Sequence, residues 1–445
     1  MDGKIEIAQR IVDEAIRRGF DEAVAVVTAS RRVMVKIANS EPTVLQQWTP
    51  IIVELYLTKD KRMFVGSYEP KSVEELLNGM DRISTMTLKV AESQLYAPLP
   101  EPTPIRYIGG LADNRILKAM GEVEKISEHI IEVAHRERID SVAGMLQLSY
   151  MRIALVSSKG VQLSEDKTAL QGYIRAFAEP DGSGQRCFTS TKYDIDGLEE
   201  MASIAARYAV DSRKREDIEP GTYDIVFSPM VFGNLLDYII DMASAFSVIM
   251  GLSIFMKNRI GDRVASEKLT VYDEPRNREL PNASSFDYES LETFDKPIIE
   301  DGILRTILHN TKTAKIMNTK STANAGWIRP SPWNIVVRSG DAKLDEIVSD
   351  VKRGLLITNN WYTRLQSYVE GLFSTIARDA VFYIENGRIV KPVNKIRVAD
   401  SFPNILNNIE HVGRDAYNVQ WWEISTPSKI PYVLVRNVKV SKHVI

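Results

Sequence analysis

YDIVFSPMVFGNLLDYIIDMASAFSVIMGLSI, residues 223–254, predicts a short strand followed at once by a long helix. The first five residues have the β-branched and aromatic composition of a strand. Ser228 is a favourable N-cap and Pro229 a favourable first helical residue, so the helix is expected to begin there. Apolar residues then recur every three or four positions, and one helix face is expected to be buried: Val231, Leu235, Tyr238, Ile239, Met242 and Phe246.

The predicted helix carries one pair of acidic residues and no His or Cys. Asp237 and Asp241 are four residues apart and therefore lie on the same helix face. Two carboxylates could hold a hard cation such as Mg²⁺ or Ca²⁺. Without further ligands nearby, a solvated stripe on an amphipathic helix is the favoured interpretation.

A charge run, DSRKRED at residues 211–217, precedes the strand and is typical of a solvated linker. A chain of 445 residues is too long for one hydrophobic core. We therefore predict two domains, residues 1–218 and residues 219–445.

The composition excludes several classes of protein. A net charge of −3 gives no broad electrostatic reason to bind nucleic acid or an anionic membrane. No apolar run approaches the roughly 20 residues that span a bilayer, and the acidic, amphipathic N-terminus is unlike a signal peptide, so a cytoplasmic location is expected. The single cysteine, Cys187, excludes an internal disulfide framework and is expected to be a half-buried side chain in a turn before a strand.

The front half predicts an α+β fold with antiparallel strands. Its strand-like runs cluster in two groups and are separated by helical patterns, which is the arrangement of α+β domains. The expected helices are residues 5–18, 73–92, 116–138 and 194–210, and the expected strands are residues 22–29, 32–38, 49–57, 62–67, 142–148, 151–157, 161–165 and 169–178. His129 and His135 share a helix but are six residues apart, so they point in different directions and cannot hold one metal ion. No glycine-rich phosphate-binding loop is present in the sequence.

The back half is predicted to be rich in short strands and tight turns. Asp301-Gly302 and Asn386-Gly387 are strong hairpin signals. A short helix at residues 403–409 is expected to be capped by Ser401. Residues 309–332 are dense in Asn, Thr, Ser and Ala, with no capacity to form a core, and are therefore expected to form a functional surface.

The back half resembles the TldD/PmbA family, whose members were described as modulators of DNA gyrase and as subunits of a zinc-dependent protease. The resemblance rests on the order and spacing of short motifs over some two hundred residues. The motifs are DIVFSP (224–229), VAS (264–266), LTVYDEP (269–275), EDGIL (300–304), NTKSTANA (318–325), PWN (332–334), GLLIT (354–358), NG (386–387) with PV (392–393), LNNI (406–409) and GRD (413–415). The resemblance implies a two-domain α+β fold with a β-rich C-terminal domain that contains one long helix.

The family has two kinds of subunit, and the sequence resembles the one without metal. The TldD kind carries HExxxH in the helix after the first back-half strand, and two His with a later Cys hold zinc. This chain has neither that motif nor a cysteine after Cys187, so it resembles the TldE (PmbA) kind. The resemblance implies that this chain binds no cofactor itself, that zinc resides in a TldD-type partner, and that the substrates are unfolded or extended peptides. A homodimer is also compatible with the family.

The resemblance assigns no catalytic and no metal-binding residue to this chain. Thr322, Asn324, Asn334 and His309 are the candidates for a substrate cleft or a partner-facing surface. For the two asparagines, hydrogen bonds that stabilise turns are an equally supported interpretation. Ala323 stands where the family usually has Gly, which leaves the conformation of that loop open.

Two alternative functions stay open. An autonomous hydrolase would have to combine Asp237, Asp241, His309 and Asp273, although no recognised spacing unites them. A regulatory binding protein, as the gyrase-modulator description suggests, would need DNA binding that the balanced charge does not favour.

Overall fold

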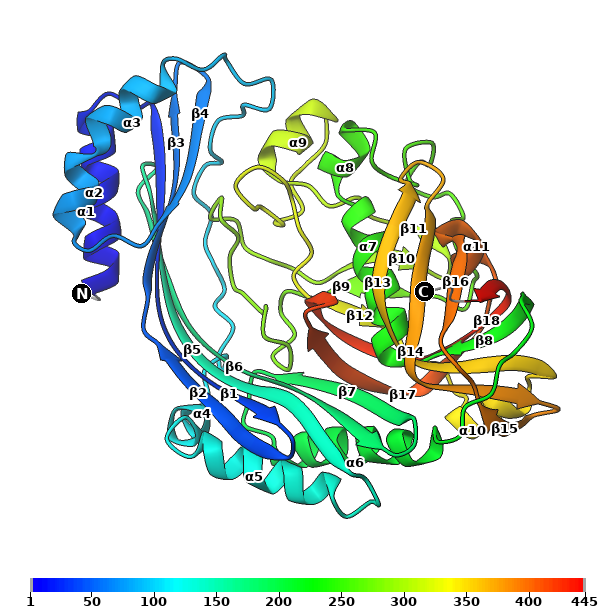
Figure 1. Cartoon of the computed structure of the whole chain (residues 1–445). Coiled ribbons are helices and arrows are strands. Elements are labelled where there is room, and N and C mark those ends of the chain that lie inside the picture. The colour runs from blue at the N-terminus through cyan, green and yellow to red at the C-terminus, as the bar shows by residue number, and fades with distance from the viewer. Residues whose placement is uncertain (1–2, 443–445) are drawn as a thin grey trace.

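Two β-sheets form the body of the molecule in the computed structural model, which describes residues 3–442. The first sheet bends around the second, and the two are joined through the helix and linker that precede the second sheet (Figure 1). Helices and antiparallel strands in separate groups confirm the α+β class.

The first sheet contains seven antiparallel strands in the order β4-β3-β1-β5-β6-β7, with β2 paired to β1. The strands are β1 (Glu22–Ala38), β2 (Glu41–Trp48), β3 (Ile51–Lys59), β4 (Arg62–Tyr68), β5 (Ser141–Ser157), β6 (Val161–Ala178) and β7 (Gly182–Ser190). The predicted antiparallel pairing is confirmed, but β1, β5 and β6 are each one continuous strand where the sequence predicted two. The polar residues that suggested breaks, such as Arg31 and Arg32, stay in the ladder and pair with Tyr150 and Ser149.

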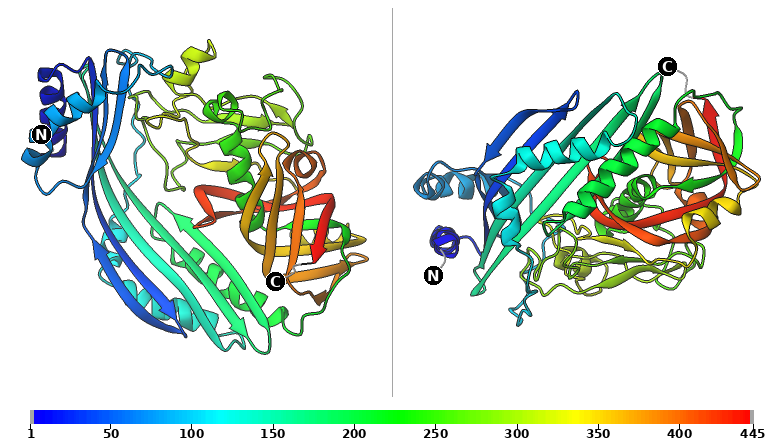
Figure 2. Two further views of the ribbon diagram at one scale, coloured as in Figure 1. Left: turned by 45° about the horizontal axis from the view of Figure 1, so that its top comes forward. Right: turned by 90° about the horizontal axis from the view of Figure 1, so that it is seen from below.

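Helices cover the outer side of this sheet (Figure 2). They are α1 (Gly3–Arg17), α2 (Val73–Asn78), α3 (Met80–Thr87), α4 (Asn114–Ala119), α5 (Val123–Ala134) and α6 (Ile195–Asp211). Two predicted long helices are each broken in two, with Gly79 between α2 and α3 and Gly121 between α4 and α5. Glycine weakens a helix interior, which explains why the breaks fall there. The helix at 194–210 is confirmed as α6, with Asp194 as its N-cap.

Successive side chains along each strand point to opposite faces of the sheet. Val33, Val35 and Ile37 pack beneath α5 in one hydrophobic core, which also contains α6. Met34 and Lys36 point to the opposite, concave face. That face is turned toward the second sheet (Figure 1).

The second sheet has eleven strands in the order β11-β10-β9-β12-β18-β16-β14-β13-β8, with β15 paired to β14 and β17 to β18. They are β8 (Gly221–Phe227), β9 (Val271–Asp273), β10 (Lys296–Glu300), β11 (Ile303–Leu304), β12 (Ile335–Val337), β13 (Arg353–Ser367), β14 (Leu372–Glu385), β15 (Arg388–Pro392), β16 (Ile396–Ser401), β17 (Ile409–Trp421) and β18 (Ile424–Lys442). The accompanying helices are α7 (Pro229–Met242), α8 (Ala245–Ile249), α9 (Thr311–Ile316), α10 (Leu344–Ser349) and α11 (Phe402–Asn407).

The central helix α7 begins where the sequence predicted, with Ser228 as N-cap and Pro229 in the first turn. The expectation of a single buried face is wrong, because β8, β13, β17 and β18 all contact the helix and bury it on nearly every side. Asp237, Tyr238 and Asp241 are the α7 residues that remain partly exposed. The helix also ends earlier than the predicted pattern, since Ser244 is extended and separates α7 from α8.

Local turn and cap signals are confirmed. Asp301-Gly302 and Asn386-Gly387 have the paired positive φ angles of tight hairpin turns, 49° and 76° in the first and 50° and 76° in the second. Ser401 caps α11 with its hydroxyl.

The predicted boundary between residues 218 and 219 stays a prediction. The linker is less solvated than expected, because Ser212 is buried and Asp181 accepts hydrogen bonds from the Lys214 and Arg215 backbone N–H groups.

Among residues 3–442, no helix is both long and apolar enough to cross a membrane.

Replacing Leu236 by Ala should destabilise the protein by about 2–5 kcal/mol, because this α7 side chain is completely buried and would leave a cavity. Urea denaturation measures the change. Leu252, which is 43% exposed, provides the matched control, and Leu252→Ala should cost about 0.5 kcal/mol or less. Equal losses for the two variants would contradict the central position of α7.

Candidate functional site

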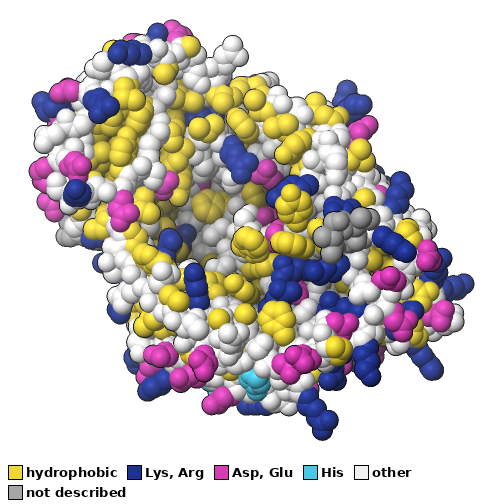
Figure 3. Space-filling model, viewed as in Figure 1, with side chains coloured by type: hydrophobic (Ala, Val, Ile, Leu, Met, Phe, Trp, Pro, Cys, Tyr) yellow, Lys and Arg dark blue, Asp and Glu magenta, His cyan; other side chains and the backbone are white. Residues whose placement is uncertain are grey.

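A groove lies between the concave face of the first sheet and the second sheet. It consists of two adjoining cavities, of about 900 Å³ and about 480 Å³, which both include Trp422 and Ser425 in their walls. Figure 3 shows the molecule hollowed between its two parts, with hydrophobic side chains along the walls. A groove of this size is large enough for several residues of an extended chain.

The larger cavity is lined by amide and aromatic side chains. Gln147 of β5 and Gln171 of β6 are direct cross-strand partners, whereas Gln185 of β7 pairs with Arg175 of β6 and lines the cavity further along. The opposite wall is the turn between β17 and β18, where Trp422 is 76% exposed. Glutamine amides both donate and accept hydrogen bonds, so these walls suit a peptide backbone without selecting its sequence.

The smaller cavity contains the partly exposed side of α7. Asp237 accepts hydrogen bonds from the Ser425 backbone N–H (2.9 Å) and hydroxyl (2.7 Å). Asp241 pairs with Arg329 at 3.1 Å. Burial raises the pKa of Asp241, and Arg329 opposes that effect. Both half-buried carboxylates are thus bound within the chain and do not form the solvated stripe that the sequence predicted.

Asp379 of β14 connects the two sheets at the base of the larger cavity. It accepts hydrogen bonds from Arg175 of β6 (2.8 Å), Asn359 of β13 (2.7 Å) and Arg378 (3.2 Å). Burial alone would raise the pKa of this carboxyl group, but the two guanidinium groups outweigh burial and lower it. The groove therefore has fixed walls and a basic end formed by Lys36, Arg175 and Arg378.

The structure brings the four sequence-predicted residues together, but away from the groove. Asp273, buried at the end of β9, connects them. Asn324 donates to the Asp273 carboxylate at 2.7 Å, and the Asn334 backbone N–H donates to it at 3.2 Å. Thr322 donates to Asn324 at 2.8 Å and accepts from the His309 backbone N–H at 2.7 Å. None of these four residues lines the two groove cavities.

Residues 309–332 form the predicted surface only in part. They contain the short helix α9; Asn310, Lys312, Thr313 and Asn324 are buried, whereas residues 315–320 are exposed and Arg329, Ser331 and Pro332 line the smaller cavity. Partners from distant segments satisfy the buried polar groups: Lys312 pairs with Glu289 at 2.6 Å and lies over the Tyr56 ring. Ala323 adopts a φ of 55°, so alanine keeps the left-handed conformation that glycine adopts more readily.

The other titratable candidates lie apart. Asp237 and Asp241 face the groove, whereas His309 and Asp273 belong to the buried network. Across the described part of the chain, no three His, Cys, Asp or Glu side chains are placed to hold a metal ion. His129 pairs with Glu199 and His135 with Ser40, so the two histidines are separate, as predicted. Cys187 lies within β7 and is 2% exposed, not half-buried in a turn; burial raises the pKa of its thiol to about 12.

Sequence reasoning missed the glutamine and tryptophan residues of the groove. The adjacent tryptophans Trp421 and Trp422 between two strand patterns were the available signal, because an exposed tryptophan in a turn is unusual. The glutamines carried no such signal, since their alignment depends on strand register.

Comparisons with known proteins were made on sequence and on structure. Residues 220–442 match the family model described as the PmbA/TldA metallopeptidase C-terminal domain, and residues 111–213 match that of the central domain. A metalloprotease of Methanothermobacter thermautotrophicus is 24% identical over 307 residues, which are 65% of this chain and 66% of that protein. Metalloprotease PmbA of Escherichia coli O157:H7 is 25% identical over 259 residues, or 55% of this chain and 56% of the relative. These alignments therefore span less than two thirds of the relatives' length.

Solved structures share the fold across nearly the whole chain. TldE from Thermococcus kodakarensis superimposes with a TM-score of 0.87 at 18% identity, covering 98% of this chain and 100% of that one. A Thermotoga maritima protein described as a modulator of a DNA gyrase gives a TM-score of 0.85 at 22% identity, with 98% and 99% covered. At such identities the likeness shows the fold alone.

Asp273→Asn should destabilise the protein by about 3–5 kcal/mol, because it leaves the buried Lys296 ammonium, now 3.0 Å from the carboxylate, without a counter-charge. Urea denaturation tests this. Asp301→Asn is the matched control: Asp301 is exposed and occupies a turn position that Asn favours, so its stability should be nearly unchanged. A mild effect at Asp273 would mean that the network is not essential.

His309→Gln should reduce the loss of stability in mild acid. Burial lowers the pKa of His309 to about 4, whereas an unfolded histidine titrates near 6.5. The unfolded chain therefore binds more protons between these values, so the contribution of neutral His309 is present above pH 6.5 and is lost as the pH falls toward 4. The denaturation midpoints of the variant and of the original chain are measured at about pH 7 and at about pH 5 and compared. His411→Gln, at a histidine that is only half-buried, is the control, and equal pH sensitivity of His309→Gln and the original chain would refute the prediction.

Proposed function

Because the chain belongs to the PmbA/TldD metallopeptidase family, we propose that it is the metal-free subunit of a zinc metalloprotease complex. It binds unfolded or extended peptides in its groove, and a partner of the TldD kind, which carries HExxxH, supplies the zinc and the water-activating glutamate. This chain supplies binding surface and a wall that excludes folded proteins.

The hydrogen bonding of the polar side chains on α7 is the observation that carries the proposal. In the TldD kind of subunit, the helix at this place in the chain provides the metal-binding motif. Here Asn234 donates to the Glu423 carbonyl at 2.6 Å, and it accepts from Asn360 at 2.8 Å and Thr363 at 2.7 Å. Asp237 and Asp241 are bound to Ser425 and Arg329. The polar side chains of α7 are thus occupied by structural hydrogen bonds, which leaves this helix a support for the groove.

The walls of the groove support binding of an extended peptide. The exposed indole of Trp422 offers apolar contact to any side chain, and the paired glutamines Gln147 and Gln171 offer hydrogen bonds to the peptide backbone. Neither type of contact depends on peptide sequence. Asp379 fixes the distance between the two walls. A folded domain is far wider than the groove, so the groove favours chains without tertiary structure.

The alternatives have less support. An autonomous hydrolase needs Asp237, Asp241, His309 and Asp273 in one site. The first two line the groove, whereas the other two belong to the buried network. Direct DNA binding is not favoured by a net charge of −3.

The test uses the purified chain alone and mixed with a family member that carries HExxxH. The chain alone should not cleave an unfolded peptide, the mixture should cleave it, and replacing the partner's motif glutamate by Gln should abolish cleavage. Trp422→Ala in this chain should lower kcat/KM of the mixture roughly tenfold or more, as expected for an aromatic contact at the centre of a binding surface.

Tyr107→Ala removes another exposed aromatic ring, outside the groove, and should leave kcat/KM unchanged. Stoichiometric zinc held by this chain, together with peptide cleavage in the absence of any partner, would overturn the proposal.

A further inference from the structure

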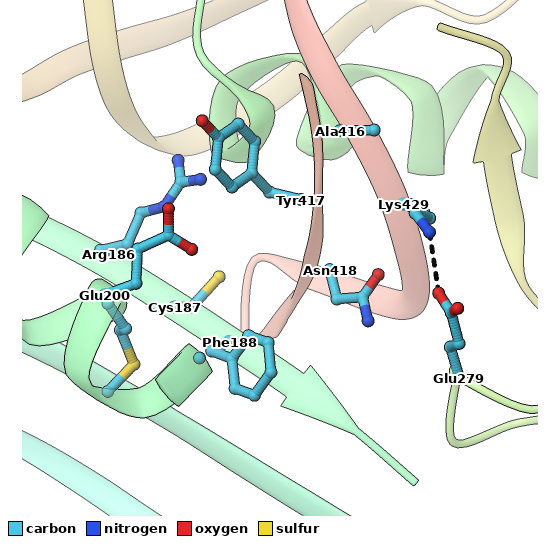
Figure 4. Close-up of a pocket in the computed structure, with 11 residues that line it drawn as sticks. Arg186, Cys187, Phe188, Glu200, Glu279, Ala416, Tyr417, Asn418 and Lys429 are labelled. Atoms are coloured by element: carbon cyan, nitrogen blue, oxygen red, sulfur yellow. Dashed lines mark hydrogen bonds and ion pairs between the residues drawn. The ribbon is translucent and has the colours of Figure 1, made fainter. Parts of the chain in front are cut away.

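A separate cavity of about 170 Å³ lies where β7 and α6 of the front half meet the β17–β18 hairpin. Its walls include Arg186, Cys187, Glu200, Tyr417, Asn418, Glu279 and Lys429 (Figure 4). In Figure 4, Arg186 and Tyr417 lie at one end, and the ion pair between Lys429 and Glu279, at 2.8 Å, lies at the other. The cavity shares no residue with the two groove cavities.

Arg186 carries a buried charge without a counter-charge. Arg186 is 3% exposed, and no group in residues 3–442 accepts a hydrogen bond from its Nη1 or Nη2. The guanidinium lies 4.4 Å from the centre of the Tyr417 ring (Figure 4). A cation–π contact of this kind stabilises a cation but satisfies none of its N–H groups in the ring plane.

The tyrosines around Arg186 do not supply an anion. The hydroxyls of Tyr208 and Tyr432 bond to each other at 2.5 Å. Burial raises the pKa of Tyr208 well above its usual value, and burial also raises that of Tyr417, so both phenols are neutral. A guanidinium cannot lose its proton at any ordinary pH. An interior arginine of this kind requires an acceptor, and a planar oxyanion matches its fork best.

A second unpartnered group and a carboxylate define the other half of the site. Asn418 Oδ1 is buried and receives no hydrogen bond from the described residues, so it can accept one from a ligand. Glu200 is exposed and lines the same cavity. These two groups favour a ligand that also carries a hydrogen-bond donor with positive charge, and they disfavour a multiply charged anion such as phosphate.

We propose that this cavity binds a small free α-amino acid. Because Nη1 and Nη2 of Arg186 and Oδ1 of Asn418 are buried in the present conformation, both side chains turn toward the cavity on binding. The carboxylate then forms a bidentate pair with Nη1 and Nη2, and the ammonium group donates to Asn418 Oδ1 and toward Glu200. A volume of about 170 Å³ admits an amino acid with a small side chain. The ligand contacts both the front half and the β17–β18 hairpin, at a site whose lining residues are distinct from those of the peptide groove.

Thermal denaturation and calorimetric titration of the purified full chain test the proposal. Glycine and alanine, up to about 10 mM, should raise the melting temperature and bind; acetate should bind more weakly, and methylamine and inorganic phosphate should have no effect. Arg186→Met should weaken alanine binding roughly tenfold or more, and Arg186→Lys, which keeps the charge but loses the fork, should also weaken it.

Arg414→Met, an exposed change on the same strand as Tyr417, is the control and should bind alanine as the original chain does. Without ligand, Arg186→Met should be at least as stable as the original chain, because a buried charge without a counter-charge is removed. If Arg186→Met does not fold, Arg186→Lys decides. Absence of alanine binding, equal binding by the arginine variants, or a preference for phosphate would each overturn the proposal.

Discussion

The buried carboxylate of Asp379 is the constraint on which the groove depends. It lies on β14 and receives the guanidinium group of Arg175 from β6, so one acidic group fixes the distance between the two sheets. Asn359 and Arg378 complete its hydrogen bonds. Because a buried ion pair is costly to break once formed, the walls keep their spacing, and the Trp422 turn stays opposite the paired glutamines of β5 and β6. The lowered pKa of Asp379 keeps it charged under ordinary conditions.

The parts of the fold that could be predicted are those that short sequences determine. Ser228-Pro229 and Ser401 start helices, and Asp-Gly and Asn-Gly make hairpins, because each acts through its own backbone. Strand length was beyond this reasoning, since polar positions inside β1 and β6 are held in place by neighbouring strands. The burial of part of residues 309–332 was missed for the same reason, because Asn324 and Lys312 are bound by Asp273 and Glu289, which are distant in sequence.

The candidate site was predicted only in part. Thr322, Asn324, Asn334 and His309 do form one connected set, as a motif-based selection would suggest, but they support the fold behind the groove. The groove itself is lined by glutamine and tryptophan side chains. Such residues carry no recognisable motif in the sequence, and only the register of the strands brings them together. Family membership and the occupied polar groups of α7 together favour a division of labour in which this chain holds a peptide and another chain cleaves it.

Peptide placement on the concave face is most directly measured by photo-crosslinking. A photoreactive amino acid replaces Gln147 in the groove or, in a second protein, Lys125 on the exposed side of α5, and each is irradiated with an unfolded peptide. The peptide should be attached to the protein labelled at position 147 and not to the protein labelled at position 125. Equal attachment at both positions, or attachment only at position 125, would contradict peptide binding between the two sheets.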